Sequence, residues 1–480
     1  MEKPKVRISV RNLVEFILRS GDLDNSRGSS GDKEAMLKGG RLHRKIQRSM
    51  KGNYQAEVSL KRESEYEDVI IQVEGRADGI FTEDGEFWID EIKGTYGNLQ
   101  AMEVPVPVHR AQAMCYGWIY GEKEGLSQIG IQMTYSHLDT EDTRRFREIF
   151  SMEELKNWYQ KLLDDYHKWI SCSLSWKKER NASMKDLQFP FPYREGQREI
   201  VSGVYHTVSS KKTLFVQAPT GVGKTMSAIF PSVRAIGEGK GETLFYLTAK
   251  TITGTVAWEA FHTLRENGLK FKVTAITAKE KLCFLDSPEC TPEKCPYAKG
   301  HFDRVNDAVY ELWTTEEVYS REVIRAHAEK WQVCPFEMCL DLSVWVDGVI
   351  CDYNYAFDPN VHLKRFFGEN ISGDYIFLID EAHNLVERGR EMYSAGISRQ
   401  SLVALRKKIR KRFSKLARTL DKANRQMMEL EENLAETGKG YQVLPNPGVL
   451  PITFLTISGE LEEILEEKEL EEELRREILE

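Results

Sequence analysis

The stretch that decides the fold runs from Thr213 to Thr225 and reads Thr-Leu-Phe-Val-Gln-Ala-Pro-Thr-Gly-Val-Gly-Lys-Thr. The largely apolar run Thr213 to Ala218 predicts a buried strand, and Met226 to Ile236 continue with the spacing of an apolar helix face. A glycine-rich turn between a strand and a helix forms a P-loop, because its N–H groups and the helix N-terminus bind phosphate. Similar apolar runs follow at Thr243 to Thr248 and Tyr375 to Asp380, so an α/β fold with a parallel sheet is expected.

Each residue of the turn has an expected role in binding ATP. The glycines let the backbone approach the phosphates, Lys224 reaches the β and γ phosphates, and Thr225 offers its hydroxyl to Mg²⁺. Ala218 stands where the usual pattern has its first glycine. The alternative is a glycine-rich turn before a buried helix, without a ligand. The residues expected to bind ATP are Thr220, Gly221, Val222, Gly223, Lys224 and Thr225.

A second polar group follows the strand expected at Tyr375 to Ile379, where the chain reads Asp380-Glu381-Ala382-His383. Ligands bind beyond the carboxyl ends of parallel strands, so both carboxylates are placed to meet the nucleotide. Asp380 is expected to hold Mg²⁺, and Glu381 to orient or deprotonate the attacking water. A helix start with a capping acid is the alternative, but the P-loop upstream favours nucleotide hydrolysis.

Five motifs in this part of the chain occur in the order found in one group of enzymes. They are Tyr193 to Gln197, Ala218 to Thr225, Leu247 to Thr251, Asp352 to Tyr355 and Asp380 to His383. Over about residues 190 to 390 the chain resembles superfamily 2 helicases of the XPD/DinG (Rad3-related) group. The resemblance implies a RecA-like motor domain that hydrolyses ATP and moves 5′ to 3′ on single-stranded DNA. It also implies that Gln197 contacts adenine and that the stretch around Thr248 touches the nucleic-acid backbone.

Four cysteines lie between the strand at Thr243 to Thr248 and the Asp-Glu-Ala-His motif, and two of them precede proline. Four thiolates can close a tetrahedral zinc site or ligate a [4Fe-4S] cluster. The paired Cys-x₂-Cys knuckles typical of zinc are absent from this stretch, whereas irregular gaps and a Cys-Pro step suit an iron–sulfur cluster. The helicase resemblance implies a cluster domain inserted here, at about residues 280 to 340. The expected ligands are Cys283, Cys290, Cys295 and Cys334.

The other four cysteines leave alternatives open. Cys339 and Cys351 are rivals for the fourth ligand position, but Cys351 ends an apolar run and is expected in the core. Cys115 and Cys172 lie outside the insertion and are expected to be small buried hydrophobic residues. The remaining alternative is that the four thiols expected as ligands bind no metal. A disulfide scaffold is not expected, because eight cysteines in 480 residues are too few for one.

The N-terminal part contains a predicted hairpin with paired carboxylates. Val69 to Phe81 and Glu86 to Lys93 are expected strands on either side of Asp84-Gly85, a dipeptide typical of two-residue hairpin turns. This turn sets Asp78 opposite Glu91. Opposed residues have Cβ atoms about 4.5 to 5.5 Å apart, so the two carboxylates can share a divalent cation.

The same hairpin resembles the PD-(D/E)xK nuclease pattern, with Asp78 first and Glu91-Ile92-Lys93 second. The resemblance covers about residues 5 to 180 and implies an α/β domain like that of restriction endonucleases. It implies that Asp78, Glu91 and the Ile92 carbonyl hold Mg²⁺ or Mn²⁺. Lys93 would position the attacking water or stabilise the charge of the transition state.

Three residues outside the hairpin resemble the RecB-type subgroup of these nucleases. His43, in a helical stretch, is implied to be a further metal ligand, while Gln112 and Tyr116 lie at i, i+4 on one helix face. Taken singly, a surface histidine and an ordinary helix face are the alternatives. The subgroup often adds its own iron–sulfur cysteines, which are not expected here because this part of the chain has only Cys115 and Cys172.

The composition of the chain indicates its general class. The chain has 480 residues, of which 30% are charged, a net charge of -8 and a mean hydropathy of -0.47, which indicates a multidomain globular protein. No signal peptide or membrane span is evident, so the cytoplasm is the expected compartment. The prolines of Asn181 to Pro192 indicate a linker. The expected domains are a nuclease-like domain at 1–185, a first motor domain at 186–390 and a helical arch-like segment at 391–480.

The last segment is predicted to be helical and has a basic run from Arg406 to Arg418. This run is expected either to line a single-strand path or to be a solvated helix face. No motif of a second motor domain follows, so the chain is interpreted as the N-terminal part of a larger helicase. The rival hypothesis is a DNA-binding or scaffold fragment with a silent ATPase and a degenerate nuclease domain that only grips DNA.

Overall fold

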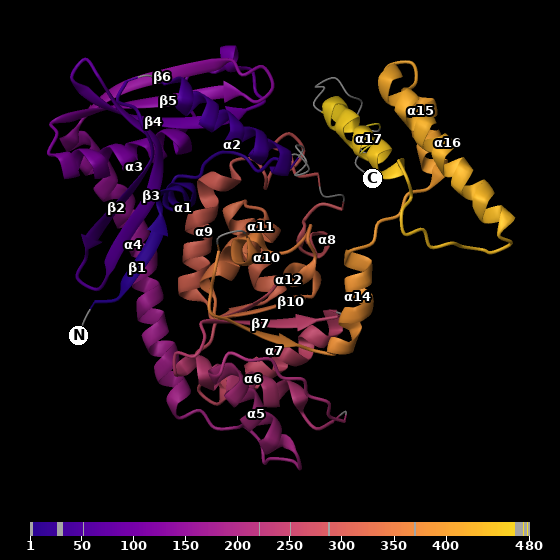
Figure 1. Cartoon of the computed structure of the whole chain (residues 1–480). Coiled ribbons are helices and arrows are strands. Elements are labelled where there is room, and N and C mark those ends of the chain that lie inside the picture. Colours follow the sequence, from indigo (N-terminus) through magenta and orange to yellow (C-terminus); the bar gives the residue numbers. More distant parts are fainter. Residues whose placement is uncertain are drawn as a thin grey trace. The chain divides into compact units, whose positions relative to one another are not determined.

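Figure 1 shows the computed structural model, which describes residues 3–25, 32–50, 52–219, 221–249, 251–286, 289–368 and 371–465, together with Leu474 and Ile478. The chain folds into two compact units, Met1–Met392 and Tyr393–Glu480. Two sheets lie in the first unit and both contain parallel strands, so the predicted α/β fold class is confirmed. Within the described ranges, no helix is long and apolar enough to cross a membrane.

The first sheet has six strands in the order β1-β3-β4-β5-β6, with β2 also paired to β3. The pairs β1–β3 and β4–β5 are parallel and the others are antiparallel. The predicted hairpin is β3–β4, and Glu83 faces Glu86 across a turn in which Asp84 and Gly85 both have positive φ. The strands are β1 (Lys5–Ser9), β2 (Gln55–Glu65), β3 (Ile70–Glu83), β4 (Glu86–Thr95), β5 (Gln128–His137) and β6 (Thr143–Ser151).

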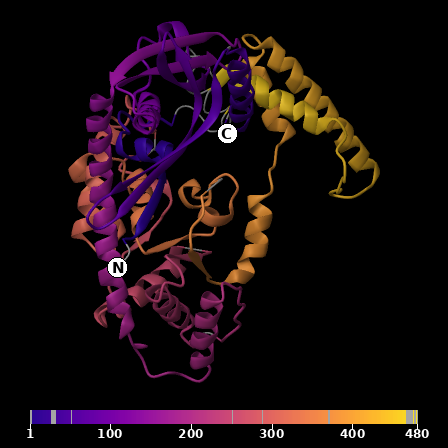
Figure 2. The ribbon, with the colours of Figure 1, turned by 60° about the vertical axis from the view of Figure 1, so that its left-hand side comes forward.

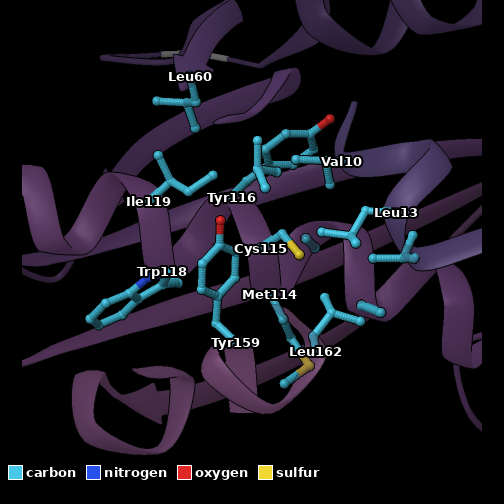
Figure 3. Packing of buried hydrophobic residues seen from close by; sticks show 14 of the residues in the cluster. Val10, Leu13, Leu60, Met114, Cys115, Tyr116, Trp118, Ile119, Tyr159 and Leu162 are labelled. Carbon is cyan, nitrogen blue, oxygen red and sulfur yellow. The ribbon is translucent and has the colours of Figure 1, made fainter. Parts of the chain in front are cut away.

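Helices α1, α3 and α4 pack together against this sheet and bury its core. Figure 3 shows Val10 and Leu13 of α1 close to Met114 and Cys115 of α3, with Leu162 of α4 beside them. Cys115 is fully buried, as predicted. The helices of this part are α1 (Val10–Ile17), α2 (Asp32–Ser49), the 3₁₀ helix η2 (Leu99–Ala101), α3 (Pro107–Glu124) and α4 (Met152–Lys185).

The second sheet is wholly parallel, in the order β11-β7-β10-β8-β9. Successive residues of a strand point to opposite faces. In β7, Leu244 and Tyr246 accordingly pack on one face with α6 and α7, whereas Phe245 and Leu247 pack on the other with α9 to α11. The strands are β7 (Thr243–Thr248), β8 (Val273–Ala275), β9 (Val318–Tyr319), β10 (Gly348–Asp352) and β11 (Tyr375–Ile379).

The helices around this sheet alternate with its strands along the chain. The longer ones are α5 (Gln197–Ser209), α6 (Lys224–Gly237), α7 (Thr251–Glu266), α9 (His301–Thr315), α10 (Arg321–Trp331), α11 (Pro335–Leu342) and α14 (Leu385–Met392). The shorter ones are α8 (Lys279–Leu282), η3 (Ser343–Trp345), α12 (Asn354–Phe357), α13 (Lys364–Phe367) and η4 (Ala382–Asn384).

One predicted strand is wrong. Thr213–Ala218 has no regular secondary structure, and Phe215 within it is 86% exposed. A strand forms only when its backbone groups pair with a neighbour. In the described part of the chain, β11 is an edge strand that pairs with β7 alone, and Thr213–Ala218 does not pair with its free edge. The apolar sequence was therefore sufficient to predict a strand but not to form one.

The predicted linker also begins later than expected. Helix α4 continues through Asn181 to Lys185, because this stretch contains no proline and Met184 packs against α6. Further back on α4, Trp169 joins the core between the second sheet and α9 to α11. Figure 2 shows α4 running along one side of the first unit, so a single helix contacts both sheets' cores.

The second unit is helical, as predicted. Its core consists of Leu402, Ile409, Leu416, Leu420, Ala423, Ile457 and Ile464. Part of the basic run is paired inside the unit, since Arg406 lies 2.9 Å from Asp421 and Lys415 lies 3.5 Å from Glu463. The helices are α15 (Arg399–Ile409), α16 (Ser414–Glu436) and α17 (Leu450–Leu465).

Candidate functional site

The turn predicted to bind phosphate leads directly into α6, which begins at Lys224. Gly221 and Gly223 have φ values of 84° and 83°, in the left-handed region that side chains other than glycine rarely adopt. A Cβ at residue 223 would also lie 2.7 Å from Nε2 of Gln197. The shape of the turn therefore requires glycine at both positions. Thr220 lies outside the described residues.

Gln197 is 4% exposed and is held by the turn itself. Its Oε1 accepts a hydrogen bond from the Arg194 N–H at 2.7 Å, and its Nε2 donates to the Val222 carbonyl at 2.5 Å. The Arg194 guanidinium donates to the Gly221 carbonyl. The motif that ends in Gln197 thus fixes the backbone of the P-loop, while its contact with adenine stays a prediction.

The carboxylates of the Asp-Glu-Ala-His motif lie beside this turn. Immediately after β11, the Asp380 N–H donates to the Leu247 carbonyl of the neighbouring strand at 2.9 Å. The Lys224 ammonium lies 3.8 Å from Oε1 of Glu381 and donates to the Ala218 carbonyl at 3.1 Å. The structure therefore brings together the two halves of the predicted ATP site.

Two tyrosines connect these motifs, and the sequence assigned no role to either. The hydroxyl of Tyr246 in β7 lies between Thr225 and Asp380, and burial, together with the charge of Asp380, raises its pKa. The hydroxyl of Tyr353 donates to the carbonyls of Asp380 and Glu381, the second at 3.1 Å. A tyrosine in an otherwise apolar strand is the signal that could have found Tyr246, because a buried phenol needs a polar partner.

A cavity of about 710 Å³ lies at the carboxyl edge of the second sheet. Thr248, at the end of β7, is one of its lining residues, so the stretch predicted to touch nucleic acid does reach it. Arg388 reaches the cavity from α14 and lies 3.1 Å from Oδ1 of Asp352. The aromatic and cationic lining residues are Trp258, Lys281, Arg321, Tyr355 and Arg388.

Three of the four predicted cluster cysteines lie near one another. Cys295 and Cys334 belong to one small buried cluster in the insertion. The Lys279 side chain lies against the Cys290 thiol and also faces Cys334. Cys283 follows directly after α8 and is half-buried.

The remaining cysteines are placed in the cores. Cys339, the rival ligand, is buried in α11, and its thiol lies 3.7 Å from the Thr274 hydroxyl of β8. Cys351 is buried in β10, as predicted. Cys172 departs from its prediction, since it is only half-buried and lies beside Tyr310 at the edge of a core.

In the described ranges, no three or more His, Cys, Asp or Glu side chains are arranged to hold a metal ion. The predicted cysteines fit an iron–sulfur cluster in other respects. Thiolates are the ligands that such clusters take, and the buried positions of Cys295 and Cys334 give low solvent access. The Lys279 cation would offset part of the negative charge of a thiolate-bound group.

The hairpin places the predicted nuclease carboxylates where the strand pairing stops. Gly79 and Asp90 are the last paired residues of β3 and β4, so Asp78 and Glu91 come next outward, in the predicted register. There the Ile92 N–H donates to Oδ2 of Asp78 at 2.7 Å. The Asp78 carboxylate thus accepts the Ile92 N–H just beyond the β3–β4 pairing, while β4 itself continues to pair with β5.

His43 and Lys93 complete this group of side chains. Nδ1 of His43, on α2, lies 3.6 Å from Oδ1 of Asp78, and Lys93 donates to Oε1 of Glu91 at 2.7 Å. Burial, reinforced by the charge of Asp78, raises the pKa of Glu91 to about 7. Its Oε2 is buried and has no hydrogen-bond partner among the described residues. A buried carboxylate oxygen without a partner fits a site that receives a cation.

Gln112 and Tyr116 lie on α3, as predicted, and both are buried. A Cβ at residue 75 would lie 2.7 Å from the Tyr116 hydroxyl, so Gly75 of β3 gives the ring its space. The charge of Glu91 acts on the Tyr116 hydroxyl, which places the tyrosine near the carboxylates. The structure therefore brings the helix face and the hairpin together.

No role was predicted for His109 from the sequence, although it lies one helical turn before Gln112 on α3. Its Nδ1 lies 3.1 Å from the hydroxyl of Tyr135, the residue paired with Lys93 across β4 and β5. Burial, together with the charge of Lys93, lowers the pKa of His109 to about 4. Its position on the same helix face as Gln112 is the signal that could have found it.

A buried polar network next to Glu91 was also missed. The Asp90 carboxylate accepts hydrogen bonds from Thr134 at 2.6 Å, Gln132 at 2.9 Å and Tyr54 at 3.1 Å. Tyr54 crosses β3 at Gly79, where a Cβ would lie 1.9 Å from its hydroxyl. Glycine inside a strand indicates such a close approach and was the available signal.

Known proteins are similar to the part of the chain that is predicted to be a motor domain. Residues 264–402 match the family model described as DEAD_2. The Fanconi anemia group J protein homolog of Gallus gallus is 27% identical over 180 residues, which are 33% of this chain and 14% of that protein. The chain is similar to XPD/Rad3-type helicases. The general transcription and DNA repair factor IIH helicase subunit XPD of Arabidopsis thaliana is 22% identical over 309 residues, 55% of this chain and 40% of that protein.

A probable ATP-dependent helicase of Methanocaldococcus jannaschii is 40% identical over 201 residues, which are 41% of this chain and 29% of that protein. The chain thus spans between 14% and 40% of the length of these three relatives. The DEAD_2 match contains the four predicted cluster cysteines and the Asp-Glu-Ala-His motif. The hairpin with Asp78 and Glu91 lies outside it.

Proposed function

We propose that this chain is the ATP-hydrolysing motor part of a DNA helicase that moves 5′ to 3′ on single-stranded DNA in the cytoplasm. The observation that carries the proposal is the approach of Lys224 to within 3.8 Å of Glu381, because it joins the phosphate-binding turn to the carboxylate motif. The DEAD_2 match over residues 264–402 supports it. In this proposal the motor domain comprises residues 186–390 and the arch-like segment residues 391–480.

Each side chain of the site acts on one part of the nucleotide. Lys224 offsets the charge of the β and γ phosphates, and Glu381 orients the attacking water and accepts its proton. Thr225 and Asp380 would hold Mg²⁺, which supplies positive charge to the phosphate oxygens when it is bound. Gln197 supports this arrangement by fixing the backbone of the turn at Val222.

Single-stranded DNA is proposed to bind at the cavity beside Thr248. Grooves for single strands combine cations that follow the phosphates with aromatic rings on which bases stack. Arg321 and Arg388 supply cations here, and Trp258 and Tyr355 supply rings. The same cavity lies at the carboxyl edge of the second sheet, and Asp380 follows β11 at that edge. DNA contact and nucleotide hydrolysis would therefore take place at the same edge of one sheet.

Nucleotide binding tests the ATP site without requiring turnover. Lys224→Ala is expected to weaken binding of a fluorescent ATP analogue in the presence of Mg²⁺ by about 100-fold, because a phosphate loses its cation. Lys240→Ala, an exposed lysine just beyond the same helix, is the control and should bind like the wild type. Equal affinities in Lys224→Ala and the wild type would refute the assignment.

We further propose that residues 1–185 form a metal-dependent nuclease domain. Asp78, Glu91 and His43 would hold Mg²⁺ or Mn²⁺ with the Ile92 carbonyl, and Lys93 would position the attacking water. The unpaired, buried Oε2 of Glu91 is the observation that favours this function over a plain hairpin. Metal-dependent cleavage of DNA that persists undiminished in Lys93→Ala would refute the site.

The cysteine site is proposed to hold a [4Fe-4S] cluster through Cys283, Cys290, Cys295 and Cys334. Two observations support this assignment. Cys295 and Cys334 belong to the same cluster of buried side chains, and the Lys279 side chain lies beside Cys290. The purified protein is expected to be brown and to lose its colour in Cys290→Ser. A colourless protein that carries stoichiometric zinc would contradict the cluster.

A second candidate function is a DNA-binding or scaffold fragment whose ATPase is silent. The observation that favours it is the unpaired run Thr213–Ala218, which leaves the residues before the P-loop outside the sheet. A P-loop whose preceding residues are not paired in the sheet would bind nucleotide without holding its phosphates in place for the attack by water. DNA binding that is unaffected by ATP, with no hydrolysis under any condition, is the result expected for the scaffold.

A further inference from the structure

A short N-terminal segment, Gly21–Asn25, lies on the insertion that carries the predicted cluster cysteines. The Leu23 N–H donates to the Ala298 carbonyl at 2.9 Å, and the Asn25 N–H donates to the Cys290 carbonyl at 2.9 Å. These bonds join the segment after α1 to a loop that contains a predicted ligand. We call Gly21–Asn25 the N-terminal wall.

Three further hydrogen bonds hold the beginning of the N-terminal wall. The Gly21 N–H donates to Oδ1 of Asp303 at 2.8 Å, and the Gly21 carbonyl accepts from the Phe302 N–H at 3.0 Å. The Gly300 N–H donates to Oδ1 of Asp22 at 2.6 Å. Because backbone groups on both sides take part, the wall is held against the insertion in one register.

The N-terminal wall is also anchored just before Gly21. Nη1 of Arg19 lies 2.7 Å from Oδ2 of Asp341, whose side chain is 9% exposed. Nε of Arg19 donates to Asn306 at 2.8 Å. An ion pair and a hydrogen bond therefore fix the chain on α9 and α11 before it crosses the cysteine site.

The register places Leu23 over the cysteines. Leu23 is 6% exposed and belongs to the same small buried cluster as Cys295, Ala298 and Cys334. The apolar shell around a metal site controls how much water reaches it. The other buried residues of this cluster belong to the insertion, whereas Leu23 belongs to the N-terminal region. The N-terminal region therefore supplies part of the apolar shell around the cysteines.

We propose that the N-terminal wall is a structural part of the cysteine site, covering Cys295 and Cys334 and holding the backbone at Cys290 so that the site retains its metal group. The inference rests on the proposed iron–sulfur function for the identity of that group. It implies that the N-terminal region cannot be removed without weakening the cysteine site.

Thiol accessibility tests the wall without any cluster. In the metal-free, reduced full chain, Leu23→Ser is expected to raise the alkylation rate of Cys295 and Cys334 by about ten-fold or more, because local opening exposes them. Peptide mass spectrometry after iodoacetamide treatment reads this rate. Leu99→Ser is the control, since Leu99 has a similar exposure of 8% in the other core, and it should leave both rates near those of the wild type. An unchanged rate in Leu23→Ser overturns the proposal.

Loss of cluster absorbance in air provides a second measurement with a milder variant. Asp22→Ala removes the acceptor of the Gly300 N–H and should bleach about three-fold or more faster than the wild type, since the wall opens more often. Asp165→Ala, on the exposed side of α4, is the control. If the wild type never binds a cluster but Leu23→Ser exposes the thiols, the iron–sulfur proposal fails and the wall stands. If the cluster binds and both wall variants bleach like the wild type, the wall is overturned.

Discussion

The guanidinium of Arg180 lies 2.6 Å from the carboxylate of Asp347, and each side chain is 5% exposed. Arg180 is near the end of α4, and Asp347 directly precedes β10, so this buried pair joins the long helix to the second sheet. The Asp347 carboxylate also accepts hydrogen bonds from the Trp176 indole at 2.8 Å and from the Lys272 N–H at 2.9 Å. A buried charge with this many partners is stable only while its cation is present.

Arg180→Met is therefore expected to lower the free energy of unfolding by about 3–5 kcal/mol, because it leaves the Asp347 charge buried without a cation. Urea denaturation followed by tryptophan fluorescence measures this loss. Lys177→Met on the same helix is the control. Its partner Glu242 is 62% exposed, so the expected loss there is about 0–1 kcal/mol. Equal losses in the two variants would contradict the buried pair.

Gly79 and Tyr54 form a testable steric pair beside the carboxylate site. Gly79→Ala is expected to cost about 1–3 kcal/mol of stability, since its Cβ would lie 1.9 Å from the Tyr54 hydroxyl. In a Tyr54→Ala background the same substitution should cost far less, because the obstacle is gone. A double-mutant cycle by thermal denaturation measures the difference. Additive effects of the two substitutions would show that the ring does not cross Gly79.

His109 predicts a pH dependence of stability. Its pKa of about 4 lies below the usual value of about 6.5, so the folded protein resists protonation that the unfolded chain accepts. Stability contributed by neutral His109 is therefore present above pH of about 6.5 and is lost as the pH falls toward 4, by roughly 1–3 kcal/mol. His109→Gln should flatten this part of the profile, whereas His262→Gln, an exposed histidine on α7, should not. A profile that is identical in His109→Gln would contradict the buried, neutral histidine.

Glu91 should show opposite effects on metal binding and on stability. Glu91→Gln is expected to weaken Mn²⁺ binding by about ten-fold or more and to raise the melting temperature of the metal-free protein, because the buried oxygen no longer carries a charge. Titration calorimetry and differential scanning fluorimetry measure the two effects. Glu86→Gln, at the tip of the same hairpin, is the control. If Glu91→Gln lowered the melting temperature and kept its Mn²⁺ affinity, Glu91 would be a structural residue.

The sequence was sufficient to predict those elements that are determined by residues close together in the chain. The periodic run Thr243–Thr248 forms β7 with the predicted bounds, and Asp84-Gly85 fixes the register that brings Asp78 next to Glu91. The nucleotide motifs were predicted from glycine, lysine and carboxylate residues at fixed spacing, and their role stays a prediction. In the structure the two motifs meet where the Lys224 ammonium lies 3.8 Å from Oε1 of Glu381.

The errors and omissions involve partners that are distant in sequence. Thr213–Ala218 has the composition of a strand, but pairing depends on a neighbour that its own residues do not encode. The N-terminal wall has no periodicity, because its backbone groups rather than its side-chain pattern bind the insertion at Ala298 and Cys290. Tyr246 was missed for a similar reason, since its polar partners come from α6 and from the end of β11.

Steady-state ATP hydrolysis by the full chain, with and without single-stranded DNA, decides whether Lys224 and Glu381 form a working motor site. We expect Mg²⁺-dependent turnover that DNA stimulates, and a loss of about 100-fold or more in both Lys224→Ala and Glu381→Gln. Lys240→Ala should hydrolyse ATP like the wild type. No turnover with or without DNA, or turnover that survives both substitutions, would contradict the motor and favour the scaffold.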